Sequence, residues 1–129
     1  MSVRPKSEMP AVVASLDVSL MPLKTRIPGA MPSKVYEALA SGAVPVVAKG
    51  SDAEKLMAEQ AAGLSYEPGD VDELVGCITR LGDHRDQREA MRERAVALAK
   101  RFDRGRLAQR SEAVLVAVAS GRVAPEIEW

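Results

Sequence analysis

The chain has 129 residues, 47% of them hydrophobic and 28% charged, which is the balance of a globular protein with one core. Its 18 basic and 18 acidic side chains cancel, so no global field favours binding to nucleic acid or to an anionic membrane. No apolar run approaches the ~18 residues of a membrane span, and the opening MSVRPKSEMP lacks the apolar centre of a signal peptide. Cys77 is the one cysteine of the sequence, so an internal disulfide is not possible. We therefore expect a cytoplasmic protein.

Three short apolar runs predict β-strands, and a helix-like piece over residues 7–16 precedes the first of them. Continuous, β-branched runs are typical of strands that are covered on both faces, as in parallel sheets. The predicted strands are DVSLMPL (17–23), VPVVA (44–48) and GLSYEP (63–68).

Helical stretches alternate with these strands and then follow them. Gly63 is expected to cap the second helix, and Asp70 with Glu73 has the spacing of a capping box at the start of the third. The order of elements predicts an α/β fold, a partial Rossmann-like, three-layer α/β/α domain around a parallel sheet of about three strands. Residues 120–129 are expected to form a tail. The predicted helices are 33–41, 52–62, one that opens at Asp70, and the C-terminal helices 84–101 and 104–119.

The stretch PSKVYE (32–37) opens a helix directly after the loop KTRIPGAM, at the carboxyl end of the first strand. Parallel sheets bind ligands at this edge, and a helix N-terminus attracts anions. Pro32 suits the first helical turn, which leaves Ser33 and Lys34 to meet a phosphate. Glu37, one turn deeper, can accept hydrogen bonds from two ribose hydroxyls. The alternative is structural: Ser33 as an N-cap, and Glu37 as a surface carboxylate.

Other polar residues are weaker candidates. Lys24 lies just after the first strand, where it is either a residue that contacts the donor phosphate or an ordinary exposed lysine. Arg4 is a candidate to flank a nucleobase. We expect His84 to be a surface residue and Cys77 a small core residue. The many arginines between residues 80 and 110 are interpreted as a solvated helical face. No cluster of metal-ligating residues stands out in the sequence.

Three ordered blocks carry a resemblance to a known family: LDVSLMPL, PSKVYEALASGAVPVVA and AAGLSYEPGDVDELVGCITRL. They resemble the donor-binding lobe of retaining glycosyltransferases of the two-lobed B-type fold. More narrowly, they are similar to the bacterial surface-polysaccharide group with the pattern PSK-x-x-E, which is glycosyltransferase family 4-like. The resemblance covers about residues 9–118, so residues 1–129 are expected to form one partial nucleotide-sugar-binding lobe.

The resemblance implies roles for individual residues. Glu37 matches the second glutamate of the family's paired-glutamate motif, which holds the ribose hydroxyls of the donor. Ser33 and Lys34 match positions whose main chain meets the diphosphate. Gly29 stands where many relatives have the first glutamate, so the identity of the sugar stays open, and Met31 belongs to the same loop of the site. The expected donor is a UDP-sugar, with no metal, no further cofactor and no catalytic residue in this chain.

The resemblance also implies a larger enzyme. The acceptor lobe, the first strands of this lobe and the basic pair that stabilises the leaving diphosphate have no counterpart here. We therefore expect a donor-binding lobe that serves transfer to a glycan or lipid-linked acceptor. Such a lobe needs an N-terminal lobe or a partner chain and is not catalytic alone. The alternative is a non-catalytic accessory or oligomerisation module. In the family, the strand like 17–23 pairs with a strand absent here, so we expect self-association through its exposed edge.

Overall fold

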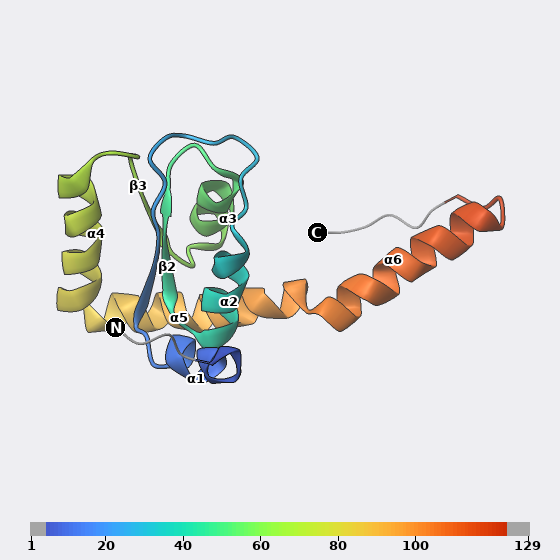
Figure 1. Ribbon diagram of the computed structural model, residues 1–129, viewed down its shortest axis with the longest axis horizontal. Helices are drawn as coiled ribbons and strands as arrows, with labels where there is room; N and C mark the ends of the chain where they lie inside the picture. Colours follow the sequence, from blue (N-terminus) through green and yellow to red (C-terminus); the bar gives the residue numbers. More distant parts are fainter. Residues whose placement is uncertain (1–4, 124–129) are drawn as a thin grey trace.

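A sheet of three parallel strands forms the centre of the fold (Figure 1). The structure, a computed structural model, describes residues 5–123. The strands follow one another in the order β1-β2-β3, with Val18 opposite Val44 and Val46 opposite Leu64. Helices cover both faces, so the predicted α/β fold class is confirmed. The strand bounds are β1 Val18–Met21, β2 Val44–Ala48 and β3 Leu64–Tyr66.

The helices agree closely with the predicted segments. The predicted piece at 7–16 is a 3-10 turn followed by a short α-helix, and the predicted helix at 84–101 ends in a 3-10 turn. The helical elements are η1 Lys6–Glu8, α1 Met9–Ala14, α2 Ser33–Ser41, α3 Asp52–Gln60, α4 Val71–Asp83, α5 Arg85–Ala99, η2 Lys100–Phe102 and α6 Arg104–Ala119.

Two local predictions about helix ends need correction. Gly63 does not cap α3, because the helix already ends at Gln60 and its cap residue is Ala61, which adopts the left-handed conformation with φ 47°. At the start of α4, the Asp70 carboxylate accepts from Glu73 N, as in a capping box. The Glu73 side chain does not return to Asp70, however. It accepts hydrogen bonds from the Lys49 ammonium and from Glu67 N instead.

The core has two parts, one on each face of the sheet. β2 is the central strand, and all five of its residues are buried. One side of the sheet packs against α2, α3 and α5, with Leu39 and Met57 fully buried there. The other side packs against α4 and the start of α5, with Leu81 fully buried and Cys77 half-buried at the margin. Burial raises the pKa of the Cys77 thiol, in keeping with the expected core role.

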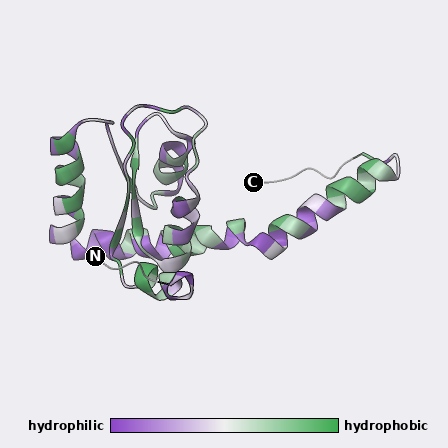
Figure 2. Ribbon diagram, viewed as in Figure 1, coloured by the Kyte–Doolittle hydropathy of each residue, from purple (hydrophilic) through white to green (hydrophobic). Residues whose placement is uncertain are grey.

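The last helix leaves the body of the domain. Figure 1 shows α6 extending away from the sheet beyond the end of α5. Its first half is hydrophilic and its outer half apolar, as Figure 2 shows. In the outer half, Leu115 is 68% and Val118 62% exposed. This helix therefore contributes little to the core, and its position matters mainly for the surface that it forms beside α2.

Gly63 provides a test of the packing between α3 and the sheet. A Cβ at this position would lie 2.5 Å from the backbone oxygen of Pro45 and 2.8 Å from the sulfur of Met57. Because the oxygen belongs to the buried strand β2, it cannot move away at low cost. We expect Gly63→Ala to lower the free energy of unfolding by about 1–3 kcal/mol in urea titrations.

The matched control is Gly76→Ala in α4, where an added Cβ meets no atom within 4 Å. Alanine favours the helical conformation over glycine, so this variant should gain about 0.5–1 kcal/mol. Equal stability of the two variants would contradict the close approach of α3 to β2.

Candidate functional site

The start of α2 is open. Pro32 is the N-cap residue, with φ −59° and ψ 132°, and Ser33 is the first helical residue. The prediction that Pro32 lies in the first helical turn is therefore wrong. The alternative prediction, that Ser33 is the N-cap, is wrong as well. No side chain caps this helix, whereas Ser51 caps α3 and Asp70 caps α4. Within residues 5–123, the N–H groups of Ser33 and Lys34 have no hydrogen-bond acceptor. Two donors at a positive helix end are therefore available to an anion.

The loop before α2 is tied to the neighbouring elements. Leu23 N donates to the Tyr66 hydroxyl at 3.2 Å, and Arg26 forms two hydrogen bonds with the Glu67 carboxylate, at 2.8 and 2.6 Å. Near its end, the Ala30 oxygen accepts hydrogen bonds from two N–H groups at the start of α3, at 3.1 and 3.3 Å. These contacts hold the loop at the carboxyl edge of the sheet. The Arg26 side chain can pack there because residue 50 is glycine: a Cβ at Gly50 would lie only 2.8 Å from the Arg26 side chain.

The three loop residues of the predicted site lie in different surroundings. Lys24 is exposed and forms no hydrogen bond or ion pair with the described residues. Gly29 is exposed with φ 78°, a left-handed conformation that strongly favours glycine. Met31 is half-buried and packs against the core on the α2 side of the sheet. Arg4 lies outside the described residues.

A groove runs beside α2. It has a volume of about 1070 Å³ and lies between one face of α2 and the segment from the end of α5 to the first half of α6. Ser33 and Glu37 stand one turn apart on this face and both line the groove. Lys34 is exposed but does not line it, and neither do Lys24, Gly29 and Met31. The structure thus brings two of the six candidate residues together in one concave surface.

The Glu37 carboxylate is exposed and has no hydrogen-bond or ion-pair partner among the described residues. The neighbouring Tyr36 ring packs against Phe102, with 4.9 Å between the ring centroids and 55° between the ring planes. This contact joins α2 to η2, and both aromatic residues line the groove. A carboxylate without a partner beside unused N–H groups can accept hydroxyl donors while the helix end receives an anion.

Sequence reasoning missed the opposite wall of the groove. It carries Lys100, Arg101, Arg104 and Arg106, which the sequence suggested were part of a solvated face. The only available signal was the interruption of the helical pattern at Phe102-Asp103. Asp103 caps α6 by accepting from Arg106 N at 3.0 Å, and the chain changes direction there. The sequence cannot show that this turn places the basic segment opposite α2, because that placement depends on how Phe102 packs against α2.

Two other carboxylates near the carboxyl edge are already occupied. Glu73 accepts from Lys49 Nζ at 2.5 Å and from Glu67 N at 2.6 Å, and both interactions lower the pKa of its carboxyl. The guanidinium of Arg26 likewise lowers the pKa of Glu67. These groups hold the ends of the strands and loops together, so they differ from Glu37, which the fold leaves without a partner.

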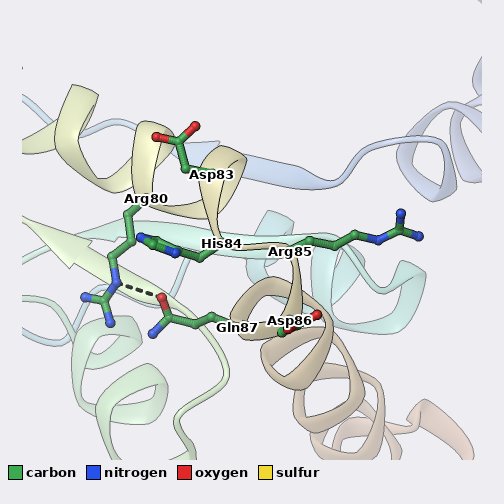
Figure 3. Close-up of a pocket in the computed structure, with 6 residues that line it drawn as sticks. All are labelled: Arg80, Asp83, His84, Arg85, Asp86 and Gln87. Atoms are coloured by element: carbon green, nitrogen blue, oxygen red, sulfur yellow. Dashed lines mark hydrogen bonds between the residues drawn. The ribbon is translucent and has the colours of Figure 1, made fainter.

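A second hollow, of about 690 Å³, lies where α4 meets α5 (Figure 3). Arg80 Nε donates to Gln87 Oε1 at 2.8 Å across it, and the exposed His84 stands at the turn between the helices. This place is at the end of the sheet away from the loop before α2 (Figure 1). None of the candidate site residues lies there, and His84 is the surface residue that the sequence indicated.

Residues 5–123 contain no group of three or more His, Cys, Asp or Glu side chains that could bind a metal ion. In the same part of the chain, every helix is too short or too polar to cross a membrane.

Comparisons with known proteins add a family and a fold. Residues 2–115 match the family described as "Glycosyl transferase-like". Among solved structures, the chain is similar to Alr3699/HepE of Anabaena, described as a complex with UDP, with 23% identity and a TM-score of 0.76. The match covers 87% of this chain and 30% of that chain, so the protein spans less than a third of its structural neighbour. At this identity the likeness shows the fold alone. No curated protein sequence matches.

Glu73 provides a test of the network at the carboxyl edge. Its carboxyl has a pKa below the ordinary value of 4.5 because Lys49 and the N–H of Glu67 stabilise the charged form. A group of this kind stabilises the fold above its unfolded pKa, and the stabilisation is lost as the pH falls through the folded pKa. We expect the free energy of unfolding to fall more steeply in the parent than in Glu73→Gln as the pH is lowered below about 5.

The control is Glu59→Gln, on the exposed side of α3, where the carboxylate has no partner among the described residues. The free energy of unfolding of Glu59→Gln should change with pH as that of the parent does. Urea titrations at each pH decide the question, and a Glu73→Gln curve parallel to the parent curve would count against the network.

Proposed function

Since the chain belongs to the glycosyl transferase-like family, we propose that the open start of α2 and the groove beside it bind a nucleotide-sugar donor. The observation that carries the proposal is the placement of Ser33 and Glu37 one turn apart on the groove face of α2, with Glu37 unpartnered. The N–H groups of Ser33 and Lys34 would receive a phosphate, and the Glu37 carboxylate would accept two ribose hydroxyls.

The remaining candidate residues have supporting roles in this proposal. Lys24 and Gly29 lie in the loop that leads to the site, where Lys24 could approach a phosphate and Gly29 leaves space beside the sugar. Met31 fixes the end of that loop, because its side chain packs on the core. The solved complex of Alr3699/HepE with UDP supports UDP as the nucleotide to test first.

We extend the proposal to the class of reaction. The pattern Pro32-Ser33-Lys34 with Glu37 supports membership of the surface-polysaccharide branch, with a glycan or lipid-linked acceptor. The activity that we propose for this chain alone is donor binding without transfer, with transfer requiring a further lobe or a partner chain. A cytoplasmic location fits this role, because nucleotide sugars are the substrates and Cys77 is a free thiol.

Glu37→Gln tests the donor site. The substitution keeps the size of the side chain but removes the charge that strengthens hydrogen bonds from the two hydroxyls. We expect a loss of about 1.5–3 kcal/mol in the binding of UDP, measured by titration calorimetry, which is a factor of roughly ten to a hundred. Glu59→Gln on α3 makes the same chemical change outside the groove and should bind UDP as the parent does. A Glu37→Gln variant with parental affinity would leave Glu37 as a surface carboxylate.

A second candidate function is association with another copy of the chain. β1 pairs only with β2 among the described strands, so its other edge has no strand beside it. Leu20 is 43% exposed on this strand although the adjacent Met21 is only 4% exposed. An unpaired, apolar edge favours pairing with a second chain across a two-fold axis. This observation supports the alternative of an oligomerisation module.

Leu20→Lys tests the edge. A lysine at an edge strand discourages strand addition, and Leu20 is exposed enough for the charge to reach water. We expect light scattering at micromolar concentration to show dimers or larger species for the parent and a monomer near 13.8 kDa for the variant. Leu115→Lys, a similar change at a 68% exposed position on α6, is the control and should associate like the parent. A parent that stays monomeric on concentration would refute the association.

A further inference from the structure

The wall of the groove opposite α2 is strongly basic. Lys100 and Arg101 come from η2, and Arg104 and Arg106 from the first turn of α6. The bend at Asp103, with φ −58° and ψ 127°, separates the two elements. The Tyr36–Phe102 contact joins η2 to α2, and the basic residues of η2 and of the start of α6 line the same groove as Glu37.

These four cations have no carboxylate partner among the described residues. Arg106 donates at 3.4 Å to the backbone oxygen of Lys100, which leaves its charge unneutralised. The carboxylates that line the groove are Glu37 and Asp103, and Asp103 already caps α6. Neighbouring like charges repel one another, so a wall with this excess of positive charge favours a ligand with more than one negative charge.

We infer that this wall binds the diphosphate of the donor, so that the chain supplies its own phosphate-binding cations across the groove from Glu37. The inference rests on the proposed function. A nucleoside diphosphate carries both a diol, which suits a carboxylate, and two phosphates, which suit arginines. A free sugar lacks the charge, and inorganic phosphate lacks the diol. The ligand that matches both walls is therefore a nucleoside diphosphate, with the phosphates toward Arg101 and Arg104.

The test compares UDP with uridine, which lacks the phosphates, in the double variant Arg101→Gln/Arg104→Gln. Loss of two charge-assisted contacts should weaken UDP binding about tenfold and leave the much weaker binding of uridine, followed by NMR, unchanged. The UDP affinity of the parent should fall as NaCl is raised, and that of the double variant should fall less. The matched control, Arg80→Gln/Arg85→Gln in the hollow between α4 and α5, should bind UDP like the parent.

Each outcome decides the inference. A double variant that binds UDP with parental affinity overturns it and leaves the proposed donor site intact. Equal weakening of UDP and uridine also overturns it, because the wall would then act on the nucleoside or on the fold. A thermal melt of each variant distinguishes an effect on nucleoside binding, which leaves the melting temperature unchanged, from an effect on the fold, which lowers it. A parent chain that binds no UDP at all refutes both the proposed function and the inference.

Discussion

The burial of β2 is the constraint on which the other elements depend. Its five residues are covered on both faces, and its backbone pairs with β1 on one side and β3 on the other. Removal of such a strand from water requires apolar layers above and below the sheet, which α4 supplies on one face and α2, α3 and α5 on the other. The close approach of Gly63 to Pro45 shows how tightly the connection after α3 fits this strand.

This packing also decides where chemistry can occur. Parallel strands end at one edge, and there the chain uses charged side chains to hold its loops: Arg26 with Glu67, and Lys49 with Glu73. These pairs are partly exposed, so their contribution is positional more than energetic. Glu37 lies on α2 outside these pairs and has no hydrogen-bond or ion-pair partner among the described residues. The contacts with Tyr66, Glu67 and the start of α3 order the loop, and the N-terminus of α2 that follows it has no side-chain cap.

The groove joins the two charge types that a nucleoside diphosphate needs. α2 supplies a carboxylate and a helix N-terminus, and the η2–α6 segment supplies arginines. Neither wall alone makes a convincing site, because a helix start and a basic helical face are each common on protein surfaces. Their opposition across a space of about 1070 Å³ is what supports donor binding in a chain of this family.

Local signals were enough to predict most of the fold. The β-branched run of β2, the alternation of strands and helices and the cap at Asp70 are short-range patterns, and each appears where the sequence indicates. The end of α3 was misplaced because Ala61 adopts a conformation that usually requires glycine. At the site, the spacing of Ser33 and Glu37 determined that both lie on one helical face, since residues four apart are neighbours on a helix. Only the tertiary structure decided what lies opposite that face. The packing of Phe102 on Tyr36 and the bend at Asp103 place arginines that are distant in sequence across the groove from Glu37. Such a contact joins residues far apart in the chain, so no local periodicity encodes it.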